Sequence, residues 1–66
     1  MTIELNGERI ELDSQPTVAA LVERTGARQH GVAVAVDGEV VPRSAWDDTE
    51  VADGQRVEVV GAIQGG

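Results

Sequence analysis

The sharpest chemical feature of this 66-residue sequence is the Gly65-Gly66 pair at its end. Glycine has no Cβ, so such a pair can pass through a narrow channel in conformations that other residues rarely adopt. A free terminal carboxylate is unreactive, but adenylation by ATP would turn it into a mixed anhydride with AMP. Sulfide or a persulfide can then displace AMP and leave a thiocarboxylate. Taken alone, the pair is also open to the interpretation of a frayed chain end.

The other residue types that could do chemistry lack the neighbours they would need. No cysteine is present, which excludes disulfides, thiolate metal sites and a cysteine nucleophile. His30 is the single histidine and is interpreted as a loop residue rather than a metal ligand. Neither Ser14 nor Ser44 has the local signature of a catalytic dyad. Asp47-Asp48 is interpreted as a solvated turn rather than an acid–base pair.

The length of the chain argues against an enzyme. A domain of about 60 residues buries only about 60% of the surface of its unfolded chain, which leaves little room for a cleft beside a core. We therefore expect one domain whose chemistry lies at the surface or at a terminus, with a larger partner supplying the catalytic groups. The start of the sequence lacks the features of a signal peptide, and no apolar run could span a membrane. A soluble, cytoplasmic protein, monomeric when free, is expected.

The formal net charge of −7 comes from twelve acidic residues against five arginines, without any lysine. Such a surface repels nucleic acid and anionic lipid, so neither is an expected partner. Such a charge would raise the rate of association with a basic protein surface. The alternative interpretation is that the charge serves only to keep the protein soluble. No glycine-rich phosphate loop with its lysine is present, so we expect no cofactor, nucleotide or metal to be bound by this chain.

Period-two alternation and tight turns predict the strands. Residues 2–5 and 9–12 alternate around Asn6-Gly7, the strongest short signal for a hairpin. Residues 32–36 are apolar on both faces, which favours an interior strand. Asp37-Gly38 predicts a turn into a short strand at 39–41. After a loop pinned by Trp46 and a turn at Asp53-Gly54, residues 56–60 form the last strand.

One short helix is predicted between the first hairpin and the third strand. Thr17 is a plausible N-cap and Gly26 a left-handed stop. Val18, Leu21, Val22 and Thr25 recur at the spacing of one narrow stripe, which must lie on the hairpin. The order of elements predicts an α+β fold of the ubiquitin-like β-grasp type: a mixed four- to five-stranded sheet packed on one short helix. Residues 1–60 would form the domain and 61–66 a flexible tail.

Strand parity also predicts a contact surface. Val57 and Val59 should face the core, whereas Ala33, Ala35 and Val60 should face away from the helix, as a docking patch or as ordinary apolar surface. Ile63 would anchor a partner or pack on the end of the last strand. Six extended residues, 61–66, would reach about 20 Å, enough to thread the carboxylate into a partner.

The whole chain resembles the ThiS family of sulfur carriers within the ubiquitin-like β-grasp superfamily. The resemblance is carried by I-E-L-N-G-E at 3–8, T-V-A-A-L-V at 17–22, A-V-A-V-D-G-E-V-V-P-R-S-A-W at 33–46, D-G-Q-R-V-E-V-V at 53–60 and I-Q-G-G at 63–66. The V-P-R-x-x-W segment and the short length are its most specific parts.

The resemblance implies a sulfur carrier in the formation of the thiamine thiazole. A ThiF-like adenylyltransferase would use ATP and magnesium to adenylate the Gly66 carboxylate. A cysteine desulfurase persulfide, or another donor, would supply sulfur, and thiazole synthase would accept it. Gly66 would carry the sulfur, Gly65 would allow passage, and Gln64 is given no role.

Three alternatives share the fold. The small subunit of molybdopterin synthase also ends in Gly-Gly but is usually longer. A ubiquitin-like modifier would form an isopeptide with a lysine of another protein. A plain β-grasp interaction module would not depend on the terminal carboxylate at all.

Overall fold

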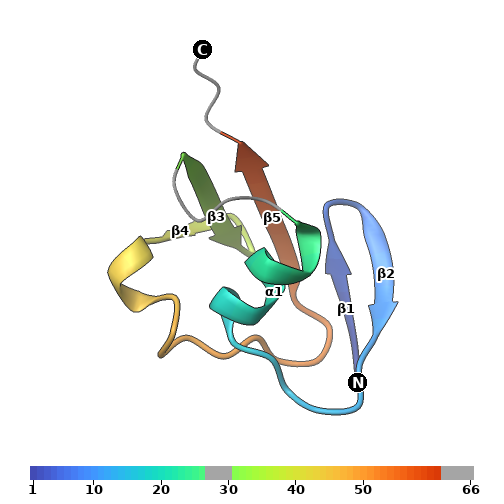
Figure 1. Cartoon of the computed structure of the whole chain (residues 1–66). Coiled ribbons are helices and arrows are strands. Elements are labelled where there is room, and N and C mark those ends of the chain that lie inside the picture. Colours follow the sequence, from blue (N-terminus) through green and yellow to red (C-terminus); the bar gives the residue numbers. More distant parts are fainter. Residues whose placement is uncertain (27–30, 62–66) are drawn as a thin grey trace.

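The computed structural model describes residues 1–26 and 31–61. In chain order the elements are β1 (Thr2–Leu5), β2 (Glu8–Glu11), α1 (Val18–Thr25), β3 (Val32–Val36), β4 (Glu39–Val41), the 3₁₀ turn η1 (Arg43–Ala45) and β5 (Arg56–Gly61). The strands form one sheet in the order β2-β1-β5-β3-β4. β1 pairs in parallel with β5, and the other described pairs are antiparallel. The helix α1 covers one face of this sheet (Figure 1), so the predicted β-grasp architecture is confirmed.

Both predicted hairpin turns are present, and each begins with a residue other than glycine at positive φ. Asn6 has φ 51° and Gly7 φ 83°, and Asp37 and Gly38 have φ 51° and 84°. Asn and Asp tolerate the left-handed region better than other side chains do, and glycine enters it freely. The two turns fix the register of β1 on β2 and of β3 on β4.

The helix begins and ends where the sequence predicts. The hydroxyl oxygen of Thr17 accepts a hydrogen bond from the Ala20 amide at 3.1 Å. Gly26 ends the helix at φ 79°, and its amide donates to the Glu23 carbonyl. The first two amides of α1, at Val18 and Ala19, donate to carbonyls of the loop after η1. With its first amides already paired to that loop, the helix N-terminus is satisfied from within the fold.

One apolar core lies between α1 and the sheet. Its buried members come from every described strand except β2 and β4, from the helix, and from the loops that follow η1: Ile3, Leu5, Val18, Leu21, Val22, Val34, Trp46, Val51, Val57 and Val59. The predicted helical stripe holds for its first three residues. Thr25, its fourth, is the last residue of the helix and is exposed. Its hydroxyl donates to the Val22 carbonyl at 2.7 Å.

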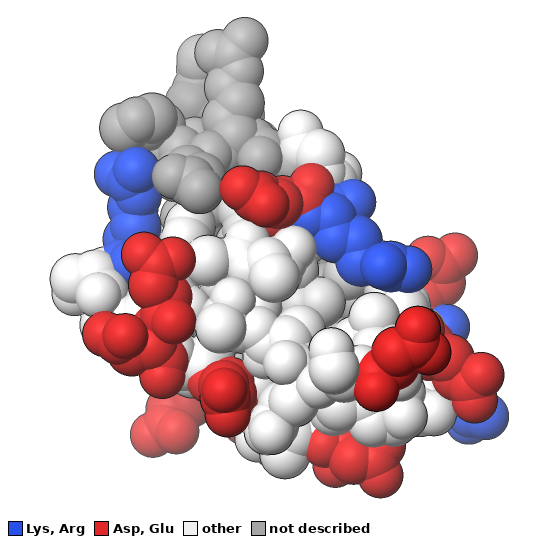
Figure 2. Space-filling view, turned by 60° about the horizontal axis from the view of Figure 1, so that its bottom comes forward, with Lys and Arg blue, Asp and Glu red and all other residues white. Residues whose placement is uncertain are grey.

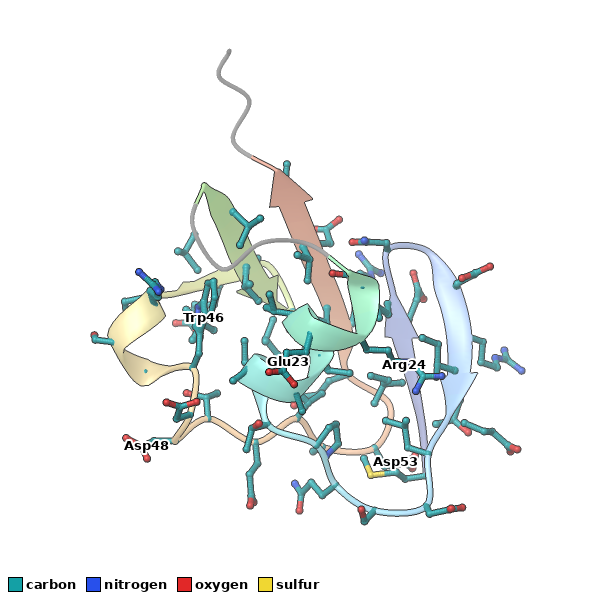
Figure 3. The ribbon with its side chains drawn as sticks, viewed as in Figure 1. Glu23, Arg24, Trp46, Asp48 and Asp53 are labelled. Carbon is teal, nitrogen blue, oxygen red and sulfur yellow. The ribbon has the colours of Figure 1, made fainter. Side chains whose placement is uncertain are left out.

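The segment after β4 is held by Trp46, as the sequence predicts. The side chain is only 4% exposed and points into the core from the loop that follows η1 (Figure 3). Its indole nitrogen donates to the Val41 carbonyl at 2.9 Å, which ties this loop to the last residue of β4. None of the helices among the described residues is long and apolar enough to cross a membrane.

Candidate functional site

The strand that leads toward the Gly-Gly end lies in the middle of the sheet. β5 is flanked by β1 on one side and β3 on the other. It runs one residue further than predicted, because Gly61 still pairs with Val32. The last described strand is therefore a central strand whose direction is fixed by partners on both sides. The predicted site residues Ile63, Gly65 and Gly66 lie outside the described residues.

The two faces of β5 have different roles. Val57 and Val59 are buried against α1, as predicted. Arg56, Glu58 and Val60 alternate with them and are exposed on the opposite, open face of the sheet. Val60, predicted to contact a partner, is 60% exposed, one residue before β5 ends. It is therefore available to any protein that approaches the end of β5.

An apolar patch surrounds Val60 on the open face. Val60 is paired with Ala33, and Ala35 is paired with Val40, so these side chains share one side of the sheet. We call these four residues the open-face patch. The placement of Ala33, Ala35 and Val60 agrees with strand parity. Val40, 72% exposed, was not predicted, although the two-residue turn at 37–38 already sets it opposite Ala35.

The other half of the open face is charged. Glu4 is paired with Arg9 on one side and with Arg56 on the other. The Arg56 Nε atom lies 3.8 Å from the Glu4 carboxylate, and both side chains are well exposed. Exposed pairs of this kind contribute little to stability. The open face is thus divided into a charged half on β2, β1 and the start of β5, and a mostly apolar half on β3, β4 and the end of β5. Glu58 is the charged exception in this second half.

Asp37 orients the start of β5. Its carboxylate accepts hydrogen bonds from the Arg56 amide at 2.9 Å and from the Gln55 side chain at 3.1 Å. The bond from the Arg56 amide has the larger effect and the bond from Gln55 the smaller. Together they hold the pKa of Asp37 below its ordinary value of 3.8. Because the carboxylate is used to join the β3–β4 turn to β5, we interpret its shift as structural.

The remaining candidates do not form a catalytic centre. Asp47 and Asp48 are exposed, and Asp48 points outward, at the edge of the molecule (Figure 3). Ser14 and Ser44 are exposed as well. Among residues 1–26 and 31–61, no group of His, Asp and Glu is arranged to hold a metal ion. The loop position predicted for His30 lies outside these ranges.

Acidic side chains dominate the surface on the side of the loops. In the view of Figure 2 they are spread around a largely uncharged central area, with fewer basic side chains between them. This distribution agrees with the net charge of −7. A basic protein surface would be attracted to this molecule over long range.

The comparisons with known proteins agree with one another. The model of the ThiS family matches residues 2–66. The sulfur carrier protein ThiS of Escherichia coli (strain K12) is 33% identical over 66 residues, which cover all of both chains. A crystal structure of the thiamine biosynthesis protein ThiS from Geobacter metallireducens superposes with a TM-score of 0.82, at 33% identity and full coverage of both chains.

One further relative differs in length. A protein of Paramagnetospirillum magneticum named thiazole synthase is 36% identical over 66 residues. The match covers all of this chain but only 20% of that protein. A segment similar to this whole chain thus occurs within a much longer polypeptide that carries the name of a synthase.

Proposed function

The chain belongs to the ThiS family, and from this we propose that it is a sulfur carrier of thiamine biosynthesis that holds sulfur on its C-terminal Gly66 carboxylate. The observation that carries the proposal is the similarity to the sulfur carrier ThiS over the full length of both chains. The protein acts as a carrier and as a co-substrate of its partners, not as an enzyme. It works, on this proposal, in the cytoplasm.

The chemistry of loading requires two steps on a partner. A ThiF-like adenylyltransferase would bind ATP and magnesium, and an oxygen of the Gly66 carboxylate would attack the α-phosphate, so that pyrophosphate leaves. A persulfide from a cysteine desulfurase, or another sulfur donor, would then attack the acyl carbon and release AMP. The product of that attack is an acyl disulfide. A thiol reductant would supply two electrons to cleave its S–S bond, which leaves the thiocarboxylate on Gly66 and releases the donor cysteine as a thiol. This chain contributes no catalytic side chain to these steps.

The contribution of this chain is to present the terminus. β5 is held on both sides up to Val59 and on the β3 side up to Gly61. The five residues 62–66 that follow can reach about 17 Å when extended, at about 3.3–3.6 Å per residue. Gly65, without a side chain, would let the terminus pass a narrow entrance. A rigid strand followed by a short segment suits delivery into a partner's interior.

We propose that the partner contacts the open-face patch while it holds the terminus. Val60 lies one residue before the last residue of β5, so an enzyme that encloses residues 62–66 must come close to it. The exposed side chains of Val60 and Val40 would be removed from water on binding, which favours association. Ile63, beyond the strand, would extend the same contact.

Thiazole synthase is the proposed acceptor. A segment like this chain is found within a protein of that name, which fits two components that act on one another. The molybdopterin-synthase small subunit and the protein modifier share the fold, but no observation on this chain favours them over the thiamine pathway.

The acceptor is tested with the loaded protein. The thiocarboxylate form is offered in turn to thiazole synthase with its other substrates and to the large subunit of molybdopterin synthase. We expect thiazole formed in proportion to carrier consumed with the first, and no sulfur transfer with the second. Transfer to the molybdopterin enzyme alone would refute the thiamine assignment.

A further inference from the structure

Glu58 places a carboxylate within the open-face patch. It is exposed on the central strand β5 and is paired with Ala35, which is paired in turn with Val40. Val60 follows two residues later on the same face. Directly opposed side chains in a sheet have Cβ atoms about 4.5–5.5 Å apart, so the carboxylate stands beside the apolar groups of the patch.

The arginines described on this face lie next to Glu4 rather than being paired with Glu58. The one ion pair among the described residues joins Arg56 to Glu4, at 3.8 Å. Arg9 also lies on the far side of Glu4. Of the described residues, Arg9 and Arg56 thus lie around Glu4 in the charged half. Neither forms an ion pair with Glu58, although Arg56 lies two residues before it on the same face.

A partner that covers the patch must take water from Glu58. Burying a carboxylate without a compensating charge or hydrogen bonds is strongly unfavourable, and the contact of two valines would not offset it. A surface that binds here must therefore either leave the carboxylate in water or bring a cation to it. Glu58 lies at the corner of the patch, beside Ala35 across the sheet and two residues from Val60 along β5. A surface that covers both Val60 and the Ala35–Val40 pair passes over this corner, which favours the second arrangement.

We propose that the adenylating enzyme sets one arginine or lysine against Glu58, within a ring of apolar side chains that cover the open-face patch. The inference rests on the proposed function, since that enzyme must approach the end of β5 to reach the terminus. An arginine suits the site best, because its guanidinium can donate two parallel hydrogen bonds to one carboxylate. The net charge of −7 would steer such a basic surface toward this molecule.

Edge protection does not explain this carboxylate. Charged residues on strands often serve to prevent pairing with other molecules, but that role belongs to edge strands. β5 lies in the middle of the sheet, and Glu is a poor strand former. Glu58 therefore has no evident role in the fold, which favours a role in recognition.

The test is the affinity of the full chain for the adenylating enzyme, measured without ATP at low and at high ionic strength. We expect Glu58→Gln to weaken binding by about tenfold or more at low salt. The salt dependence of binding should fall at the same time. Glu23→Gln is the matched control, because Glu23 is exposed on the outer side of α1 (Figure 3) and the change in charge is the same.

Three outcomes would overturn the inference. Binding of Glu58→Gln that is unchanged or tighter would mean that no cation meets the carboxylate. An equal loss with Glu23→Gln would mean that only net charge matters. Self-association of Glu58→Gln with unchanged affinity for the enzyme would mean that the carboxylate only keeps the patch soluble.

A charge exchange sharpens the assignment. Glu58→Arg should abolish binding, and replacing the opposing cation of the enzyme by Glu should restore it.

Sulfur loading separates this inference from the proposed function. If the unaltered chain is loaded but Glu58→Gln binds equally well, only the role of Glu58 fails. If the unaltered chain is never loaded, the proposed function fails.

Discussion

The side-chain oxygen of Asn6 accepts a hydrogen bond from the Val59 amide at 2.8 Å. The backbone amide of Asn6 donates to the Val57 carbonyl at 2.9 Å. One turn residue thus continues the pairing between β1 and β5 beyond Leu5, where the regular ladder ends. It holds the last described strand in place, and its own backbone has φ 51°.

Asn6 is therefore expected to contribute to stability in two separable ways. Asn6→Gly keeps the turn and loses the bond to Val59, at a cost of about 0.5–1.5 kcal/mol. Asn6→Ala also places an unfavourable side chain at positive φ, which adds about 1–2 kcal/mol. Urea unfolding followed by Trp46 fluorescence measures both. Asn6→Asp, which keeps the acceptor, is the control, and equal stability of the Gly and Ala variants would contradict this account.

Asp37 predicts a pH dependence of stability at the acid end. Its pKa is lowered in the fold, so the carboxylate stabilises the protein above the unfolded pKa and this contribution is lost as pH falls through the folded pKa. Asp37→Asn should be less stable than the unaltered protein above about pH 5, and the difference should shrink below about pH 3. Urea midpoints across this range test the prediction. A difference that stays constant with pH would show that charge at Asp37 is irrelevant.

Of the side chains outside the strands and the helix, Trp46 is expected to be the one whose replacement lowers stability most. Trp46→Phe keeps most of the apolar volume but leaves the Val41 carbonyl without its indole partner, at about 1–3 kcal/mol. Trp46→Ala also opens a cavity, for a total of about 3–5 kcal/mol. Thermal unfolding followed by far-UV circular dichroism measures both. A Phe variant as stable as the unaltered chain would remove the role assigned to the indole bond.

Thr17 should contribute through its cap alone. Thr17→Ala removes the acceptor for the Ala20 amide and should cost about 1 kcal/mol. Thr17→Ser keeps an oxygen at the same place and should change stability by only a few tenths of a kcal/mol. Chemical denaturation of the pair checks this, and a Ser variant as unstable as Ala would refute the cap.

The open-face patch should affect binding without affecting the fold. Val60→Asp and Val40→Asp replace side chains that are 60% and 72% exposed, so stability should change by less than about 1 kcal/mol. Each should weaken binding of the adenylating enzyme about tenfold, which corresponds to about 1.4 kcal/mol. Ala20→Asp, exposed on the helix, is the control. Unchanged affinity of both valine variants would exclude the patch as a contact.

Local rules were enough to predict most of the fold. The Asn6-Gly7 and Asp37-Gly38 turns, the Thr17 cap and the Gly26 stop each depend on residues close in sequence, and all are present. What sequence reasoning missed depends on distant partners. The bond from Val59 to Asn6 joins residues 53 positions apart, and the last strand gains Gly61 only because Val32 lies beside it.

The site was predicted in part. The alternation of residues along single strands placed Ala33, Ala35 and Val60 on the open face. That Val40 belongs to the same patch follows only from the pairing of β4 with β3. Glu58 could not be singled out, because a glutamate among alternating valines is ordinary until its neighbours across two strands are known. The roles of Gly65 and Gly66 stay predictions that depend on chemistry with a partner.

The central claim is that Gly66 carries sulfur, and the intact mass of the protein tests it most directly. The chain is incubated with its adenylating enzyme, ATP, magnesium and a sulfur donor. A gain equal to the exchange of one oxygen for sulfur is expected, located at the C-terminus, and absent from a folded variant that lacks Gly66. No gain with an enzyme shown to be active on a known ThiS protein, or an equal gain in the variant without Gly66, would contradict the account.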